Sequence, residues 1–394
     1  MSSLQGKLLE AITEQDLQQL VTQSEQESQT LEYKREPYKR NDEDTREMLR
    51  DITAIANAYG GDLLIGVDED VNGAAFELVG IAKAEEESQR IISSCLSNIA
   101  ERIEGLRSHP VPLQNGLFVL VVRIPRSLRA PHMVAFKGLN QFWIRHDRQK
   151  SPMSIHEVKD TCLKVEGLME KLERFLAKRR QEILEDIGDI PYYSVSVTPL
   201  FVDSGVVDIQ DSVLQGLLTH PAPLSTDGNL SVGAGFARFT LHGLKIQYTS
   251  WYPSIELFRN GHLEFCVEAK PLLEKVNIRA QQAIPQFASL VLSAHSFTFI
   301  SLASRVFMYI GLTDPAIVSI SFYNIKGYGL PRSGTMPFPL EAHEIWPKFH
   351  LEIEPLQFFS LSPVRSTTQE CLNRIWQAFG HAHAPAMPST YTDT

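Results

Sequence analysis

The chain has 394 residues, and its 37 lysines and arginines against 47 aspartates and glutamates give a formal net charge of −10. Hydrophobic residues make up 43% and charged residues 21%, a globular composition that excludes a fibrous or wholly disordered protein. The acidic balance argues against a protein that coats nucleic acid non-specifically, because such proteins carry a positive excess. It does not exclude a local basic groove. The length predicts two or three domains.

The four cysteines and the N-terminal segment indicate the compartment. No two cysteines have CxxC spacing, so no zinc knuckle is expected. A disulfide framework is not expected either, because four cysteines are few for a chain of this length. The first twenty residues lack the apolar core of a signal peptide, and we expect a cytoplasmic protein. The uncharged run 280–304 is long enough for a membrane span, but its glutamines, proline and histidine favour a buried helix followed by a strand. No membrane partner is predicted.

Hydrophobic spacing predicts alternating strands and helices in the first 190 residues. Asp44 and Glu47 are spaced as a capping box that would open a helix, and Gly60 with Gly61 would end it. In chain order we expect a strand at 31–36, that helix, a buried strand at 63–67, a helix at 85–104, a strand at 117–125, a loop and hairpin at 127–138, a strand at 141–146 and a long amphipathic helix at 154–185.

The second half of the chain is rich in alternating Val, Ile, Phe and Tyr, which predicts strands. These strands fall at 192–202, 236–251, 254–269, 305–312 and 316–325, with a hairpin turn at 259–261 and a helix at about 270–291. The predicted class is therefore α/β (α+β). We expect an N-terminal domain at 1–160, a linking helix at 161–190, an α+β C-terminal domain at 191–380 and a flexible tail at 381–394.

Acidic residues and one lysine in the first domain have the pattern of a metal-dependent hydrolytic site. Glu27 and Glu32 lie on either side of a short segment, Lys34 follows on the same strand face as Glu32, and Asp68 comes at the end of a buried strand. Mg²⁺ and Mn²⁺ prefer such oxygen ligands, and phosphodiester hydrolysis uses a metal and a nearby cation. From spacing alone, the alternative is a solvated acidic turn at Asp68 and an ordinary exposed Glu32–Lys34 pair.

Four segments in this order, ESQTLEYK, IANAYGGDLLIGVDED, VVRIPRSLRAPH and FWIRHDRQKSPMS, resemble the AlbA_2 domain of the Schlafen family over roughly residues 20–160. The resemblance implies a bacterial member with a mixed sheet flanked by helices. It also implies a metal-dependent endoribonuclease that cuts structured RNA, most of all tRNA, and that acts in antiphage defence. The family's three-carboxylate centre for Mg²⁺ or Mn²⁺ falls here on Glu27, Glu32 and Asp68, and its lysine on Lys34.

The chain departs from animal Schlafens, which carry two related lobes and a zinc site, because it shows one copy of the domain and no clustered zinc ligands. A homodimer would supply the missing lobe. The C-terminal domain is expected to sense a phage-derived or small-molecule trigger or to mediate oligomerisation. The alternative is a DNA-binding transcriptional regulator with a ligand-sensing C-terminal domain. ATP binding ranks last, because there is no phosphate loop.

Basic and aromatic residues alternate in two stretches of the first domain, as expected of a surface that follows an RNA backbone and stacks on bases. The interleaved aromatic residues include Tyr38 and Trp143. The alternative is that the cations form solvated faces and that Trp143 belongs to the core, which we favour for this tryptophan. The predicted RNA-binding residues are Arg35, Lys39, Arg40, Arg126, Arg129, Lys137, Arg145, Arg148 and Lys150.

Overall fold

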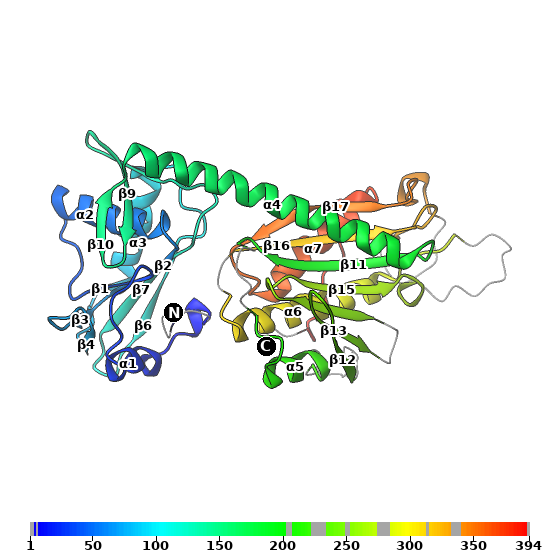
Figure 1. The fold of residues 1–394 in the computed structure, drawn as a ribbon, viewed down its shortest axis with the longest axis horizontal. Helices are drawn as coiled ribbons and strands as arrows, with labels where there is room; N and C mark the ends of the chain where they lie inside the picture. Colours follow the sequence, from blue (N-terminus) through cyan, green and yellow to red (C-terminus); the bar gives the residue numbers. More distant parts are fainter. Residues whose placement is uncertain are drawn as a thin grey trace. The chain divides into compact units, whose positions relative to one another are not determined.

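The computed structural model describes residues 4, 7–201, 207–221, 234–248, 253–273, 284–312, 315–331 and 340–391. The chain divides into two compact units, unit 1 at Met1–Lys171 and unit 2 at Leu172–Thr394. Both units combine helices and sheets, which confirms the α+β class (Figure 1). The predicted long helix is also confirmed, as α4 (Ile155–Ile187), and the boundary between the units falls inside it.

Unit 1 is built on a four-stranded mixed sheet in the order β1-β2-β7-β6. Only β1 and β2 run parallel, and the other pairs are antiparallel. A second sheet has the order β10-β9-β8-β5, and β3 pairs with β4. The strands are β1 (Leu31–Lys34), β2 (Gly61–Ile65), β3 (Val67–Glu69), β4 (Ala75–Leu78), β5 (Ile99–Ala100), β6 (Arg107–Pro112), β7 (Phe118–Ile124), β8 (Met133–Phe136), β9 (Leu139–His146) and β10 (Gln149–Pro152).

Helices cover both faces of the four-stranded sheet, and strand alternation explains how. Leu63 and Ile65 of β2 pack with the apolar faces of α2 (Asp42–Ala56) and α3 (Ala84–Asn98). Leu64, between them, packs on the opposite side with the segment that contains η1 (Leu9–Ala11) and α1 (Glu14–Thr22). The strand is buried on both faces and therefore reads as a continuous apolar run.

Three predicted boundaries in unit 1 are wrong, each for a local reason. Asn41 rather than Asp44 caps α2, because the Asn41 side chain accepts a hydrogen bond from the Asp44 N–H. The predicted strand at 63–67 is interrupted at Gly66, whose φ of 103° breaks the extended backbone between β2 and β3. The predicted helix at 85–104 ends at Asn98, where β5 begins.

Unit 2 is built on a seven-stranded antiparallel sheet in the order β12-β13-β14-β15-β11-β16-β17. The predicted turn at 259–261 joins β14 to β15. The strands are β11 (Tyr192–Pro199), β12 (Gly235–Phe239), β13 (Gly243–Tyr248), β14 (Ser254–Phe258), β15 (Leu263–Glu268), β16 (Ala316–Tyr323) and β17 (Leu351–Phe358). The remaining elements are α5 (Ser212–Thr219), η2 (Lys270–Leu272), α6 (Ser289–Tyr309), η3 (Ala342–Glu344) and α7 (Val364–Ala378).

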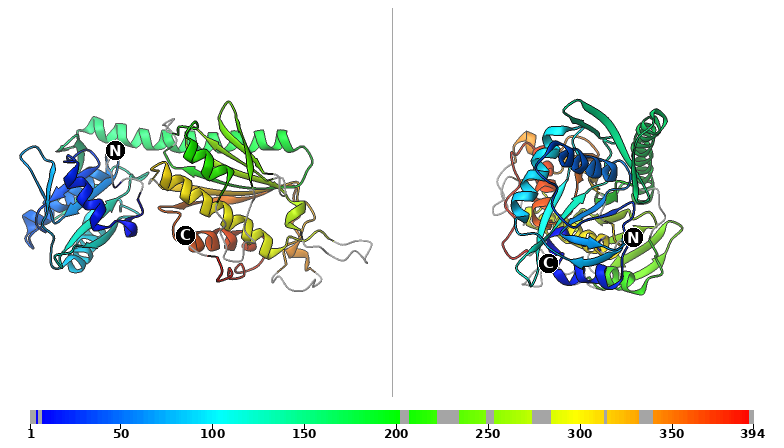
Figure 2. Two further views of the ribbon diagram at one scale, coloured as in Figure 1. Left: turned by 90° about the horizontal axis from the view of Figure 1, so that it is seen from below. Right: turned by 90° about the vertical axis from the view of Figure 1, so that its left-hand side faces the viewer.

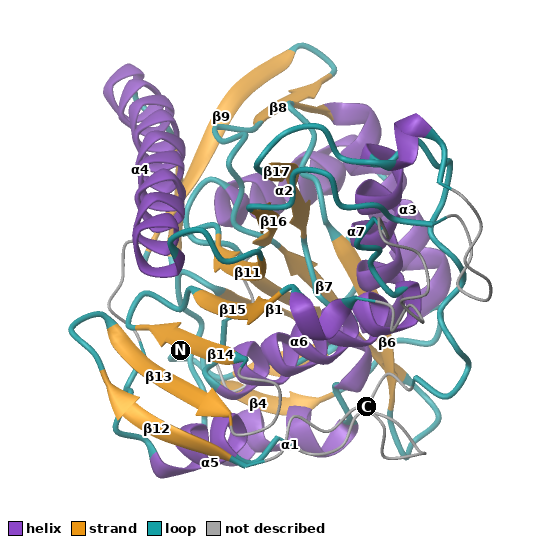
Figure 3. Ribbon diagram, turned by 90° about the vertical axis from the view of Figure 1, so that its right-hand side faces the viewer, coloured by secondary structure: helices purple, strands orange, loops and turns teal. Residues whose placement is uncertain are grey.

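The two faces of this sheet differ. Helices α6 and α7 lie side by side and share one apolar core with the strands (Figure 2). The half of α4 that belongs to unit 2 covers the opposite face (Figure 3), where Arg179 and Arg180 form ion pairs with strand residues. Trp376 and Phe297 are among the largest fully buried side chains of the apolar core.

Helix α6 is the one described helix long and apolar enough to cross a membrane, and 72% of its apolar window is buried inside unit 2. It therefore serves as a core helix, as the sequence predicted for part of 280–304. The helix continues to Tyr309, so the predicted strand at 305–312 is wrong. The predicted helix at 270–291 is also wrong over the residues that the structure describes. Of these residues, only Lys270–Leu272 and the first residues of α6 are helical, and 274–283 lie outside the described residues.

The predicted flexible tail packs on unit 2 over its described part, which ends at Tyr391. Met387 is buried in the apolar core, and its carbonyl oxygen accepts a hydrogen bond from Arg365 at 2.6 Å. His381 is buried as well and contacts the carbonyl oxygen of Leu330 at 2.9 Å. The described part of the predicted flexible tail is therefore packed against unit 2.

Gly60 and Gly138 both have a positive φ, but they differ in the space that a side chain would find. Its φ is 71°, and an added Cβ would lie against the backbone N of Arg126 and 2.8 Å from the carbonyl oxygen of Ile124. Gly138 has a φ of 82° but nothing within 4 Å of an added Cβ. Gly138→Ala should therefore lower the free energy of unfolding by only about 1 kcal/mol. Gly60→Ala should cost at least about twice as much in urea unfolding, and equal costs would contradict the close approach.

Candidate active site

Strand β1 positions two of the predicted residues. It is an edge strand, so its outward backbone groups need partners beyond the sheet. Glu27 supplies one, since its Oε1 accepts the N–H of Tyr33 at 2.8 Å. The side chain of Tyr33 is buried on one face, and Glu32 and Lys34 point to the other. The edge strand thus brings Glu27 and Glu32 to the same place.

Glu32 is the centre of a buried ion cluster. Its side chain is 7% exposed, and its carboxylate forms ion pairs with Lys34 and with Arg145 of β9. Burial alone would raise the pKa of Glu32, but the positive charges of Lys34 and Arg145 hold that pKa below its usual value. Glu32 therefore stays ionised, and the predicted pair of Glu32 and Lys34 is buried rather than solvent-exposed.

Glu27 lies in a different electrostatic environment. Its Oε2 is 3.8 Å from Nη2 of Arg145, a longer contact than the Arg145–Glu32 pair. Burial raises the pKa of Glu27 to about 7, and the charges of Glu32 and Glu69 add to the rise. The site is therefore short of positive charge at Glu27.

The sequence did not predict Asp51 as part of this cluster. Asp51 of α2 is 0% exposed, accepts a hydrogen bond from the Tyr38 hydroxyl at 2.6 Å and forms an ion pair with Lys150 of β10. Lys34 lies 3.9 Å from it, which connects the Asp51 pair to Glu32. The sequence did contain a sign of this role, because Asp51 is a carboxylate next to Ile52, within the apolar face of a helix. An uncompensated charge is costly at such a position.

The acidic segment after β2 divides between two partners. Asp68, the predicted third ligand, forms an ion pair with the exposed Arg35. The charge of its neighbour Glu69 acts on Glu27 together with that of Glu32. Oε2 of Glu69 and Cγ of Glu27 lie 3.6 Å and 4.0 Å from the position of a Cβ on Gly73. The structure therefore brings Glu69 close to Glu27, and it places Asp68 at an adjacent surface pair.

The predicted RNA-binding cations fall into several groups. Arg35 and Arg148 lie near the carboxylates, and Arg148 donates hydrogen bonds to Asn72 and Gln26 beside Glu27. The second group lies at the first turn of α2: Lys39 and Arg40 precede this turn, and Lys137 pairs with Asp42 within it. The third group, Arg126 over the ring of Tyr59 and Arg129, lies near the other end of this 15-residue helix, about 20 Å away.

Two of these predictions are corrected by burial. Arg145 is 4% exposed and is held by Glu32, so its guanidinium is not on the surface. The Lys150 side chain is 21% exposed and pairs with the buried Asp51. Trp143 is partly buried against the core, as we favoured, with Arg50 stacked 4.6 Å from its ring centre. Arg145 on β9 and Lys150 on β10, its neighbours, therefore compensate the charges of buried carboxylates.

The donor chemistry at Glu27 and Glu32 fits a hard divalent cation, because two ionisable carboxyl groups share one location and one of them lacks a full positive partner. Among the described residues, however, no group of three or more histidine, cysteine or acidic side chains has the spacing of a metal site. The fit therefore extends to the two glutamates, while Asp68 would have to leave Arg35 to join them.

A family model described as Schlafen, AlbA_2 matches residues 27–154, about a third of the chain, from Glu27 to the residue before α4. The chain carries a Schlafen AlbA_2 domain. This domain contains the whole Glu27–Glu32–Arg145 cluster. The AlbA_2 family is nuclease-like, and the domain indicates a nucleic-acid-related function.

Two solved structures are similar in part. One is the N-terminal domain of a putative ATP-dependent DNA helicase RecG-related protein from Nitrosomonas europaea, with 21% identity, a TM-score of 0.27 and coverage of 36% of this chain and 93% of that one. The other is a Corynebacterium diphtheriae protein, with 13% identity, a TM-score of 0.28 and coverage of 94% of this chain and 62% of that one. No curated protein matches the chain.

The raised pKa of Glu27 predicts a pH effect on the stability of the metal-free protein. The folded state holds this proton up to about pH 7, whereas the unfolded chain releases it near the ordinary value of 4.5. Raising the pH through this window therefore weakens the folded state. In EDTA, Glu27→Gln should raise the unfolding midpoint relative to wild type more at pH 8 than at pH 5. The exposed Glu104→Gln is the control, and an equal gain at both values would contradict the assignment.

Proposed function

We propose that the AlbA_2 domain is a metal-dependent endoribonuclease that cleaves structured RNA, with tRNA as its main substrate. The observation that carries the proposal is the Glu27–Glu32 carboxylate pair, which is held at the edge of β1 and is short of positive charge at Glu27. Structural ion clusters usually balance their charges, whereas catalytic sites often contain perturbed carboxyl groups.

In this proposal Glu27 and Glu32 hold Mg²⁺ or Mn²⁺, and Asp68 is the third carboxylate that the Schlafen resemblance assigns. The ion would supply Lewis-acid polarisation of the phosphodiester and an activated water. Asp68 is available because its partner Arg35 is 56% exposed, and surface ion pairs contribute little free energy. Lys34 is 29% exposed and places its ammonium group beside Glu32, where it would neutralise charge on the substrate phosphate.

The remaining parts of the proposal follow from the sequence and from the resemblance. They are a cytoplasmic enzyme, a homodimer in which a second copy replaces the second lobe of animal Schlafens, and a role in antiphage defence with unit 2 as the sensor. The exposed cations near the carboxylates, Arg35 and Arg148, support an RNA backbone partner because they can exchange weak surface contacts for phosphate contacts.

Cleavage of purified tRNA with Mn²⁺, and its loss in EDTA, tests the proposal. Glu27→Gln and Asp68→Asn should each reduce the cleavage rate by roughly 10²–10³-fold, the loss typical of removing one group that stabilises a transition state. Glu69→Gln is the matched control and should retain most activity, since Glu69 acts on Glu27 only through its charge. The reverse result, with Glu69→Gln inactive and Asp68→Asn active, would reassign the third carboxylate.

The unfolding midpoints of these variants should be no lower than that of the wild-type protein, because Glu27 and Asp68 lie at a site rather than in the apolar core. Activity should elute from a sizing column at twice the monomer mass, and activity confined to monomer would exclude the dimer. Metal-independent binding of duplex DNA without any cleavage of tRNA would favour the transcriptional regulator instead.

Two exposed arginines distinguish a local RNA surface from a general one. Arg148 donates to residues beside Glu27, whereas Arg129 pairs with Glu104 at 3.0 Å, away from the carboxylates. Arg148→Ala should weaken tRNA binding and reduce the slope of log affinity against log salt by about 1. Arg129→Ala should leave both unchanged in the same filter-binding titration. Equal effects would show that the RNA covers the third cation group as well.

A further inference from the structure

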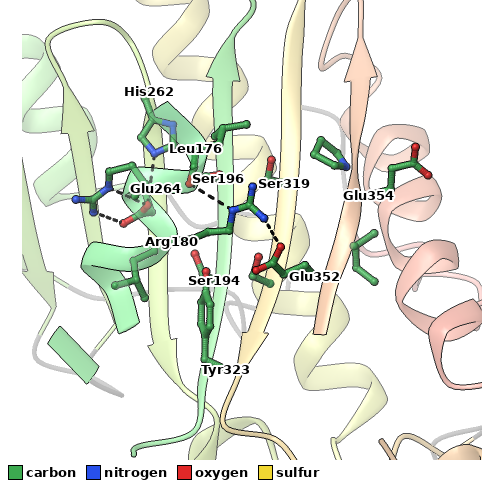
Figure 4. Close-up of a pocket in the computed structure, with 15 residues that line it drawn as sticks. Leu176, Arg180, Ser194, Ser196, His262, Glu264, Ser319, Tyr323, Glu352 and Glu354 are labelled. Atoms are coloured by element: carbon green, nitrogen blue, oxygen red, sulfur yellow. Dashed lines mark hydrogen bonds and ion pairs between the residues drawn. The ribbon is translucent and has the colours of Figure 1, made fainter. Parts of the chain in front are cut away.

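Unit 2 contains a cavity of about 240 Å³ between α4 and the sheet face that α4 covers (Figure 4). One water needs only roughly 10–15 Å³, so the space is large enough for a small organic molecule. Its walls are mostly serine and charged side chains, in contrast to the apolar core on the opposite face of the same sheet. A helix usually buries apolar side chains against a sheet, so this composition is unexpected for packing alone.

Four serines form the floor of the cavity. Ser194 of β11 lies opposite Ser321 of β16, and Ser196 lies opposite Ser319, so the four hydroxyl groups make a square on one face of two central strands. Val195 and Ile320, between them, face the apolar core. Small side chains at four adjacent positions leave the space that the cavity occupies.

Ser319 is the serine with the clearest unmet requirement. The pairing of β16 with β17 shifts between Val318 and Ile320, which leaves Ser319 without a directly opposed residue on β17. Its hydroxyl oxygen is buried and has no hydrogen-bond partner within the part of the chain that the structure describes. A buried polar atom without a partner is costly, and a ligand hydroxyl in the cavity would satisfy it.

Two ion pairs lie beside the serines. Figure 4 shows Glu264 to one side of them, and Arg180 between Ser196 and Ser319. Nη2 of Arg179 lies 2.8 Å from Oε1 of Glu264, whose other oxygen faces His262. Arg180 pairs with Glu352. Burial alone would raise the pKa of Glu264, but His262 and Arg179 lower it to about 2, so this pair is charged at neutral pH. Each arginine therefore already has an anionic partner.

The apolar atoms of the cavity come from α4, from β17 and from the ring of Tyr323 on β16. Leu176 and Ile183 of α4 lie on the same helical face as the two arginines, and Ile353 and Pro355 of β17 line the cavity beside Glu354. A molecule in this space would meet hydroxyl groups on the sheet side, hydrogen-bonding charged groups at its edges and aliphatic carbon against part of its surface.

We propose that this cavity binds a neutral polyhydroxylated molecule, a free monosaccharide or the ribose of a nucleoside. Serine hydroxyls both donate and accept, as sugar hydroxyls do, and the paired carboxylates and guanidinium groups keep further lone pairs and N–H groups for the same hydroxyls. A ligand with a negative charge would have to displace Glu264 or Glu352 from its arginine to be compensated, because Arg179 and Arg180 both already have a carboxylate partner. The site concerns binding to unit 2 alone and holds whether or not the AlbA_2 domain cuts RNA.

The test uses the full-length protein with D-ribose, D-glucose and adenosine at millimolar concentration, and inorganic phosphate as the charged probe. At least one neutral probe should raise the unfolding midpoint by a few degrees and give a saturable signal in calorimetry, while phosphate should give neither. Binding of ribose or glucose would identify a free sugar, and binding of adenosine alone would identify a nucleoside. If no neutral probe binds, or if phosphate binds instead, the proposal is wrong.

The variant Ser196→Val tests whether the ligand binds in this cavity. Valine fills part of the space, removes one hydroxyl and suits a strand, so the ligand-free protein should unfold at an unchanged or higher temperature. The affinity for the probe that binds wild type should fall at least tenfold. Ser319→Ala removes the hydroxyl without adding bulk and should weaken binding even if valine disturbs the fold. The control, Ser366→Val on the exposed part of α7, should bind as wild type does, and equal binding by all three variants would overturn the proposal.

Discussion

The buried ion pair between Glu32 and Arg145 determines how unit 1 is organised around its candidate site. A carboxylate with 7% of its side chain exposed is stable only when cations and hydrogen bonds compensate for lost water. The compensation comes from β9 through Arg145 and from β1 through Lys34, and Lys34 is in turn shared with Asp51 of α2. One buried charge therefore ties the edge of the mixed sheet to a helix and to the second sheet.

The same cluster explains why Glu27 differs from its neighbour. Arg145 commits Nη1 to Glu32, while Nη2 stays 3.8 Å from Glu27 and makes no hydrogen bond within the described residues. Glu27 accepts the Tyr33 N–H but has no close cation, and burial together with the negative charges around it raises its pKa. A divalent cation placed there would complete the compensation that Arg145 begins. An ion cluster that served only to hold strands together would gain stability from a glutamine at this position.

Much of the fold followed from local pattern, and the site followed only in part. The LEYK strand, the hairpin at 259–261 and the long helix α4 depend on periodicity and turn chemistry, which neighbouring residues determine. Arg145 and Lys150 were assigned to RNA because their sequence neighbours are basic. Their true partners, Glu32 and Asp51, are about a hundred residues away and are brought to them by the packing of β9 and β10 on α2. Alternation also separates Asp68 from Glu69, a distinction that a run of three acids in sequence conceals.

The two units use buried polar groups in opposite ways, and the difference bears on what each can bind. In unit 1 the buried charges are unequal at one point, so the site favours a cation and, through exposed arginines around it, a polyanion. In unit 2 both arginines beside the cavity already pair with glutamates, and serine hydroxyls line its floor. Such a site gains little from an anionic ligand but can satisfy many hydrogen bonds. Chemically different ligands in the two units are what the proposed combination of a nuclease domain and a separate recognition domain requires, because a signal that resembled the substrate would compete with it for the same groups.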